Sequence, residues 1–144
     1  MDTINTQRSF VKYMETGLSA LGIPVQWTEV VPDEKHEKYK VNHVNIAFAT
    51  EGKSPYAAIK DFQFTEVVID VIHNKATTAA TWRDAVMELL KVGVADYYEF
   101  TKEHPAGVPN GWVITWESDE FDYTPFGDDL IVRHSGSVQI HFRK

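Results

Sequence analysis

The side chains of this sequence that could do acid–base or metal chemistry are its histidines and carboxylates. His36 and His43 lie seven residues apart, with Glu34 and Glu37 beside or between them. Metal-binding histidines usually come in pairs one helical turn apart, or with further ligands at fixed spacing. Because neither pattern is present, we expect solvated or structural roles for these four residues.

Two other pairs are arranged poorly for catalysis. His134 and His141 belong to the predicted last strand, where a separation of seven residues places them on opposite faces unless a bulge intervenes. No serine or aspartate is fixed beside either histidine, so a hydrolytic triad has no support beyond residue types. Glu66 and Asp70 share a strand face but lie about 13 Å apart, which is too far for a glycosidase pair. We expect surface histidines, and carboxylates at the rim of an interface or on an exposed patch.

Sequence motifs of known chemistry are missing as well. The chain contains no phosphate-binding glycine loop, no nucleophile elbow and no cysteine. The lack of cysteine excludes disulfides, thiolate catalysis and cysteine-based zinc sites. We therefore predict no catalytic residues, no cofactor-binding residues, no metal site and no enzymatic activity.

The last third of the chain contains an acidic and aromatic segment between two predicted strands. Its carboxylates could bind calcium, but the ligand spacing and the glycine of an EF-hand are absent. A solvated loop, or one that contacts a basic patch on a partner, fits this composition better. The candidate partner-binding loop consists of Glu117, Asp119, Glu120, Phe121, Asp122, Tyr123, Asp128 and Asp129.

Length and charge bound the possible functions. With 144 residues the chain can bury a substantial core, and we expect a single domain over residues 1–144. The 14 basic and 21 acidic residues give a formal charge of −7, which repels phosphate backbones and disfavours tight nucleic-acid binding. Passage of DNA past a repulsive wall remains compatible with this charge. No membrane span or signal peptide is recognisable, and the lack of cysteine favours an intracellular protein.

Hydrophobic periodicity predicts an α+β fold: a mostly antiparallel sheet of four to five strands with two main helices packed on one face. Asp2 and Thr3 can cap the first helix, and Thr77 and Thr78 the second. Charged or breaker-rich segments predict loops at 32–40, 51–55, 104–111 and 118–129. The predicted elements are a helix over 4–21, strands over 24–31, 43–50 and 61–73, a helix over 79–93, a second short helix over 94–102, a strand over 111–117 and a closing strand through 138–144.

The strand over 61–73 is apolar on both of its faces. One face holds Val67, Ile69 and Val71, while the other mixes apolar residues with Glu66 and Asp70. Strands of this kind are usually covered on both sides. We expect one cover to be a helix of this chain and the other a neighbouring subunit. The candidate subunit interface is Phe62, Phe64, Glu66, Val68, Asp70 and Ile72.

The arrangement of these segments is similar to that of a known family, the tail terminator proteins of long-tailed bacteriophages, also called minor or tail-completion proteins. The resemblance covers nearly the whole chain and rests on pattern, without a signature motif. The segments that carry it are Leu21-Gly22-Ile23-Pro24 after the first helix, Val44–Phe48, Phe62–His73, Trp82–Val92, Trp112–Trp116 and the closing strand Ser137–Phe142.

The resemblance implies a structural role with no catalytic residues. Such proteins form a ring, typically a hexamer, that caps the growing tail tube and stops its polymerisation. The ring then joins the tail to a head-completion or connector protein, and DNA passes through its lumen without sequence-specific binding. The location implied is the tail or neck of the virion, after assembly in the host cytoplasm. A ring requires a heterologous contact that closes, so each copy must present two different patches.

Two alternatives remain open. A small α+β enzyme or ligand-binding domain could use His73, Asp70 or His43 in a pocket between helix and sheet. This alternative predicts that at least two of the three side chains lie within hydrogen-bond reach in a deep pocket. The other alternative is a different component of the same part of the virion, such as a head–tail connector or a baseplate protein.

Overall fold

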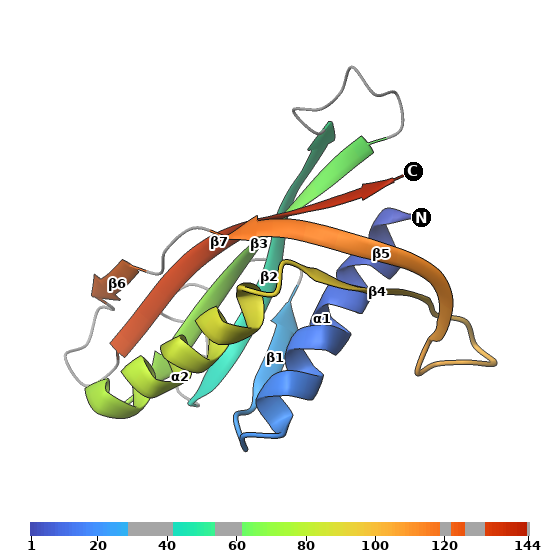
Figure 1. The fold of residues 1–144 in the computed structure, drawn as a ribbon. Coiled ribbons are helices and arrows are strands. Elements are labelled where there is room, and N and C mark those ends of the chain that lie inside the picture. The colour runs from blue at the N-terminus through green and yellow to red at the C-terminus, as the bar shows by residue number, and fades with distance from the viewer. Residues whose placement is uncertain (29–41, 54–61, 119–121, 126–131, 144) are drawn as a thin grey trace.

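The computed structural model describes residues 1–28, 42–53, 62–118, 122–125 and 132–143 (Figure 1). Within these residues the chain forms two helices and seven strands. In order they are α1 (Thr3–Ser19), β1 (Val25–Thr28), β2 (His43–Lys53), β3 (Phe62–His73), α2 (Ala76–Leu90), β4 (Val94–Glu99), β5 (Val108–Ser118), β6 (Asp122–Pro125) and β7 (Val132–Arg143).

All seven strands belong to one curled sheet with the order β1-β2-β3-β7-β5-β4. The short strand β6 pairs with β7 beside Val132–Ser135, while β5 pairs with β7 further along, beside Val138–His141. The pair β1–β2 is parallel and every other pair is antiparallel. The α+β class and the two main helices are confirmed. The expected sheet of four to five mostly antiparallel strands was wrong, because the sheet is mixed and has seven strands.

Helix α1 follows its predicted course and supplies much of the core. The Asp2 carboxylate caps its first turn by accepting from the Asn5 backbone N–H at 2.7 Å. Phe10, Met14 and Leu18, which recur every four residues, have no exposed surface. The helix therefore turns one apolar stripe to the sheet, as its sequence period requires.

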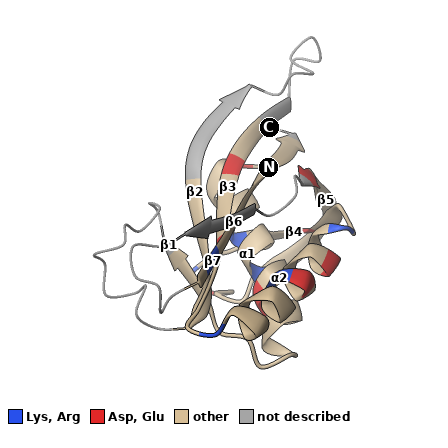
Figure 2. Cartoon of the chain, turned by 90° about the vertical axis from the view of Figure 1, so that its left-hand side faces the viewer, with Lys and Arg blue, Asp and Glu red and all other residues tan. Residues whose placement is uncertain are grey.

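One face of the sheet packs on both helices (Figures 1 and 2). Trp116 of β5 sits at the centre of this contact: its ring meets Phe10 edge-on at 5.3 Å, and its indole N–H donates to the Leu90 carbonyl at 2.9 Å. One continuous core joins α1, α2 and five strands. The strand residues at this core are Val44, Ile46, Phe48, Val67, Ile69, Val71, Tyr97, Ile114, Trp116, Val138, Ile140 and Phe142.

The two helices approach most closely at Gly17. A Cβ atom on this glycine would lie 2.5 Å from Cδ2 of Leu89, so only glycine allows the contact without a shift of the leucine. Beside it the Tyr13 hydroxyl donates to the Leu89 carbonyl at 2.6 Å. The helix pair is thus fixed by one close approach and one hydrogen bond.

The segment 94–102 does not form the expected short helix. Val94–Glu99 is strand β4, paired with β5 from Val94–Thr115 to Glu99–Val108. Its free edge is covered by α1, because Ser9 Oγ accepts from the Tyr98 N–H at 2.8 Å. Pairing with a strand remote in sequence therefore overrides the local preference. The predicted loop at 104–111 was also wrong at its end, since β5 begins at Val108.

Two other boundaries differ from expectation. Strand β2 continues to Lys53 through the predicted turn, because β3 pairs with it as far as Lys53–Gln63. Helix α2 begins at Ala76, with Lys75 as the cap position and no side-chain cap bond, so Thr77 and Thr78 lie inside the helix. The Lys75 N–H instead donates to Nδ1 of His73 at 2.9 Å, which ties the helix start to the end of β3.

Candidate functional site

The face of the sheet opposite the helices carries a row of polar residues that crosses four strands. In this polar row, Asn45 of β2 is aligned with Asp70 of β3, and Asp70 with Ser135 of β7. Asn45 and Asp70 have no exposed surface. Buried polar groups are costly unless paired, so a row of them is unusual on a sheet face. The row consists of Gln26, Asn45, Asp70 and Ser135.

Next to the polar row lies a buried histidine and a partly buried arginine. His43 is aligned with Ile72, and Ile72 with Arg133 on its other side. Arg133 Nε lies 3.8 Å from Asp70 Oδ1, longer than the 2.7–2.9 Å typical of a charge-assisted hydrogen bond. Burial raises the pKa of Asp70, and this outweighs the lowering by hydrogen bonding to Ser135 and by the charges of Arg133 and His43.

The three side chains proposed for an enzymatic site divide between the two faces. His43 and Asp70 lie on the helix-free face, and neither has exposed surface with which to touch a substrate. His73 lies on the helix-covered face, where its ring meets Trp82 edge-on at 4.7 Å. Burial and the charge of Lys75 lower the pKa of His73. The fold therefore places two of the three side chains, His43 and Asp70, on the same face, but both are buried and out of reach of a substrate.

The two histidines of β7 lie on opposite faces, as expected from their spacing. His134 is aligned with Val71 on the helix-covered face and is only 6% exposed, so the expectation of a surface histidine was wrong for it. Burial lowers the pKa of His134, with a smaller contribution from Arg83. His141 lies on the other face, with its ring 6.4 Å from that of Phe64.

The predicted subunit interface on β3 keeps only part of its accessible surface. Phe64, Glu66 and Val68 are half-buried and lie on the helix-free face. Asp70 and Ile72, at 0% and 1% exposure, are buried within the chain itself and offer no surface to a neighbour. The side chain of Phe62 lies outside the described residues. The remaining candidate interface is therefore Phe64, Glu66 and Val68.

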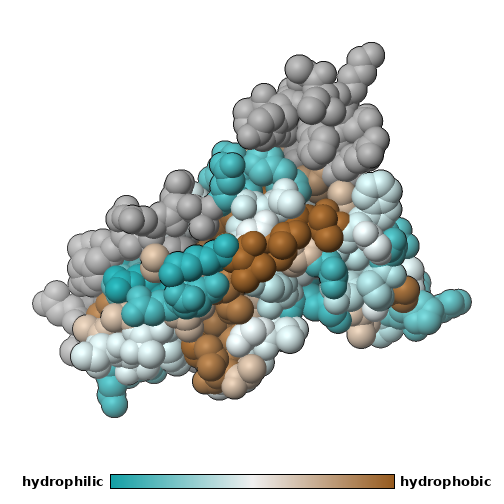
Figure 3. Space-filling view, viewed as in Figure 1, coloured by the Kyte–Doolittle hydropathy of each residue, from teal (hydrophilic) through white to brown (hydrophobic). Residues whose placement is uncertain are grey.

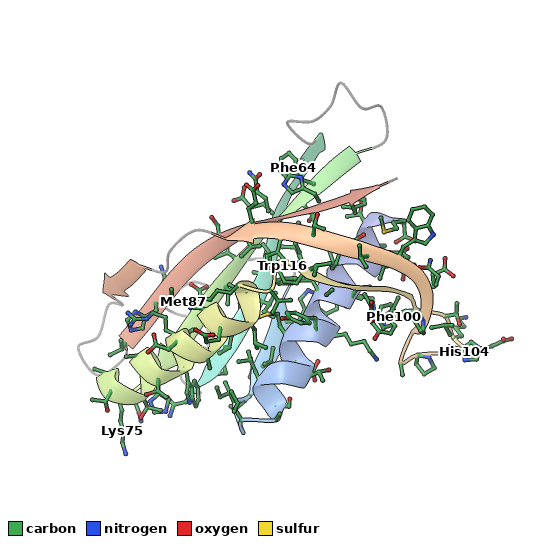
Figure 4. The ribbon with its side chains drawn as sticks, viewed as in Figure 1. Phe64, Lys75, Met87, Phe100, His104 and Trp116 are labelled. Carbon is green, nitrogen blue, oxygen red and sulfur yellow. The ribbon has the colours of Figure 1, made fainter. Side chains whose placement is uncertain are left out.

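The accessible part of β3 continues onto a projecting end of the sheet, the β2–β3 arm, where β3 also pairs with β7 as far as Phe62–Arg143. Strands β2 and β3 remain paired to Lys53–Gln63, with a register shift between Phe48 and Thr50, and project beyond the helices (Figure 1). Phe64 lies on this part of the sheet, away from both helices (Figure 4). The arm therefore presents an aromatic side chain at a position that the chain's own helices do not cover.

The acidic segment is described only in part. Asp122 and Tyr123 belong to β6, paired with Ser135 and His134, so the prediction of a loop was wrong at these positions. Glu117 is exposed near the end of β5. Several predicted features lie outside the described residues: the partner-loop residues Asp119, Glu120, Phe121, Asp128 and Asp129, the loop at 32–40, and Glu34, His36 and Glu37 of the weak metal pattern.

Two surface grooves border α1, and sequence reasoning missed both. The first, of about 530 Å³, contains Arg8, Lys12, Trp27 and Phe100. The second, of about 540 Å³, lies between α1, Leu89 and β4–β5. It adjoins an apolar band that crosses the α2–β4–β5 region (Figure 3), where the exposed residues are Val92, Val94 and Val113. Neither groove contains His43, Asp70 or His73.

Comparisons with known proteins do not assign the chain to a family. No protein-family model matches the sequence, and no curated protein matches it. Across the part of the chain that the structure describes, no three histidine or carboxylate side chains gather as metal ligands. Within the same residues, neither helix combines the length and apolar character needed to span a bilayer.

Proposed function

We propose that this protein is a structural component of a bacteriophage tail, a terminator whose copies form a ring at the end of the tail tube. The ring, typically a hexamer, ends polymerisation of the tube and joins it to a head-completion or connector protein. Its location is then the tail or neck of the virion, assembled in the host cytoplasm. DNA passes through the lumen without base-specific contacts.

The observation that carries this proposal is the helix-free side of β3. Phe64 and Val68 remain partly accessible there and continue into the β2–β3 arm, while the helices cover only the opposite face. A closed ring needs two different patches on each copy. An aromatic side chain on a projecting arm is well suited to one of them, because aromatic anchors dominate most protein interfaces.

The charge distribution fits the same role. The chain has a net charge of −7, and a negative lumen repels DNA enough to keep it from sticking during passage. In the described part of the chain, the central strands β2, β3 and β7 carry few charges, whereas α2 carries several (Figure 2). The charges at the surface of α2 include the exposed pairs Arg83–Asp84 and Lys91–Glu88, which could meet a partner without loss of sheet packing.

The enzymatic alternative has less support. His43 and Asp70 lie near each other, as that alternative requires, but both are fully buried. Neither groove on α1 brings a histidine and a carboxylate together. A different neck component, such as a connector, would use similar surfaces, and only its position in the virion distinguishes it.

The oligomeric state of the purified chain tests the proposal. Light scattering after gel filtration, alone and with tail tube protein, should give a discrete ring, visible in negative stain. Phe64→Glu with Val68→Asp should reduce it to monomers, whereas the control Val92→Asp, at a site 58% exposed on another surface, should not. A wild-type chain that stays monomeric in the presence of tube protein would contradict the proposal.

A further inference from the structure

The first groove on α1 combines cations with aromatic rings, and we call it the cationic groove. It is formed by Arg8, Lys12 and Glu15 of α1, Trp27 of β1, and Phe100 and Pro105 beyond β4, so two cations and one carboxylate line it. The groove measures about 530 Å³, which is within the range of sites that take a peptide side chain or a small ligand. Trp27 is 42% exposed within it, so the groove offers apolar as well as charged surface.

The two cations of the groove are held on rings, and neither forms an ion pair with a carboxylate of the described residues. The Arg8 guanidinium lies 4.5 Å from the centre of the Phe100 ring, and Lys12 Nζ lies 4.7 Å from that of Tyr98. Lys12 also donates to the Ala106 carbonyl at 2.7 Å. The ion pairs found among the described residues are Arg83–Asp84, Lys91–Glu88 and Arg133–Asp70. In a chain with seven excess negative charges, two cations left for another partner are a distinctive feature.

The wall of the groove is fixed before any partner arrives. Gly107 has a φ of +89°, and a Cβ atom there would lie 2.8 Å from the Phe100 ring and 3.0 Å from Tyr98 Cβ. The loop between β4 and β5 therefore packs directly on both rings that hold the cations. A preformed groove of this kind saves the entropy of ordering it upon binding.

The ligand that fits this groove is a polypeptide with both carboxylates and aromatic rings. The chain contains one such segment, residues 117–129, with six carboxylates, three aromatic residues and no lysine or arginine. We propose that the cationic groove of one copy binds the segment 117–129 of a neighbouring copy. Aromatic rings that bury about 150–250 Å² each would supply most of the affinity, while the charges fix the register.

The described part of the segment in β6 lies far from the groove of its own copy. Strand β6 lies at one end of the molecule, whereas Phe100 and His104 lie at the other (Figures 1 and 4). A contact between two different patches on two copies is heterologous and joins them head to tail. This inference rests on the proposed function, because it names the subunit contact from which the ring would be built.

A charge-swap experiment tests the contact. Arg8→Glu with Lys12→Glu alters the groove, and Asp119→Lys with Glu120→Lys alters the segment. Each double variant alone should be monomeric by light scattering. Mixed together they should assemble again into a ring in which the two variants alternate, because each intact groove meets an intact segment and each negatively charged groove meets a positively charged segment. The control Lys75→Glu with Lys91→Glu makes the same charge change at exposed positions on and next to α2 and should leave assembly unchanged.

A second measurement does not depend on assembly or on the folding of the variants. A labelled peptide of residues 117–129 should bind the wild-type chain, as measured by fluorescence anisotropy, and bind more weakly as salt rises. A peptide with amides in place of its carboxylates should bind at least tenfold more weakly. Arg8→Gln with Lys12→Gln, a milder change than charge reversal, should weaken the binding of the original peptide.

The outcomes separate this inference from the proposed function. A groove variant that still forms the wild-type ring, or peptide binding that is absent or unaffected by the groove variant, overturns the contact but leaves the ring in place. If the groove variant keeps the ring but no longer binds the tube, the groove is a site for the tube protein, and the proposed subunit contact is again overturned. If the wild-type chain binds the peptide but never assembles, the proposed function as a tail terminator is overturned instead.

Discussion

The two faces of the central sheet are both buried at β3, but by opposite chemistry. Toward the helices, Val67, Ile69 and Val71 pack into a continuous apolar core. One residue away, about 3.3 Å along the strand, Asp70 is equally buried on the other face beside Asn45 and Arg133. The alternating side chains of β3 thus face two environments, an apolar core on one side and a polar row on the other.

The difference shows what each face contributes. Burial of apolar area stabilises the fold in proportion to the area and demands no particular partner. A buried carboxyl stabilises it only when its partners compensate for lost hydration, and the raised pKa of Asp70 indicates that they do so incompletely. We infer that the apolar face supplies most of the stability. The polar row restricts the strand register, because a slip by one residue would move its polar side chains into the apolar core.

The largest expected effect is on the helix-covered face. Ile69→Ala removes a side chain with no exposed surface and should lower the free energy of unfolding by about 4 kcal/mol. The control Val68→Ala, half-buried on the other face, should cost about 1 kcal/mol. Urea unfolding measures both. Equal losses at the two positions would contradict the contrast between the faces.

Removal of the cation beside Asp70 should have the next largest effect. Arg133→Met leaves a buried carboxyl without that partner and should cost about 2 kcal/mol, less than for a fully buried pair because the arginine side chain is 22% exposed. Arg83→Met, in an exposed pair, should change stability by less than about 0.5 kcal/mol. Adding Asp70→Asn to Arg133→Met should recover part of the loss, and an additive double variant would argue against coupling of the two charges.

Neutralising Asp70 alone should matter less than removing Arg133. Asp70→Asn keeps the shape of the side chain, and the raised pKa of Asp70 means that its charged form is already disfavoured by burial. We expect a change of about 1 kcal/mol or less at pH 7. Urea unfolding of Asp70→Asn and Arg133→Met side by side tests which variant loses more stability. A larger loss of stability for Asp70→Asn would show that the carboxylate charge itself is required.

The smallest expected effect is on the pH dependence of stability. Its sign should differ between titratable groups on the two faces of the sheet. Burial lowers the pKa of His73 and of His134, so their contribution to stability is present above the usual pKa of about 6.5 and is lost as the pH falls. The raised pKa of Asp70 acts in reverse, because the folded chain holds this proton more tightly and gains stability on acidification.

Unfolding measured from pH 7.5 to 4.5 separates these contributions. The wild-type chain should lose stability on acidification through the histidines, and Asp70→Asn should lose it more steeply because the compensating proton uptake is gone. Titration of the histidine ring protons by NMR should place the pKa values of His73 and His134 below the usual one. If the stability of Asp70→Asn depends less steeply on pH than that of the wild-type chain, the sign assigned to the contribution of Asp70 is wrong.

Local periodicity was enough to predict the elements that face the core. The spacing of Phe10, Met14 and Leu18 defined α1, and the parity of Val67, Ile69 and Val71 defined the helix-covered face of β3. Strand β4 was missed because its aromatic run has no clean alternation, and its strand character comes from pairing with β5. The parallel pairing of β1 with β2 depends on a connection that periodicity does not describe.

The candidate sites depended even more on contacts that are remote in sequence. The polar row draws on four strands, and no property of Asn45 or Ser135 alone indicates that they are aligned with Asp70. Likewise Arg8 and Phe100 meet only because α1 lies along β4. Composition led to the prediction that the acidic segment binds a partner, which stays a prediction, but it gave no sign of the groove that we propose the segment occupies.

The cover of β4 by α1 limits how copies of this protein could polymerise. An open edge strand can recruit further chains without end, as amyloid does. At β4 the outward backbone N–H groups of Tyr98 and Phe100 are already bonded to Ser9 and Asn5, and another strand would have to expel the helix first. Growth by strand addition at this edge is therefore blocked as long as α1 stays in place.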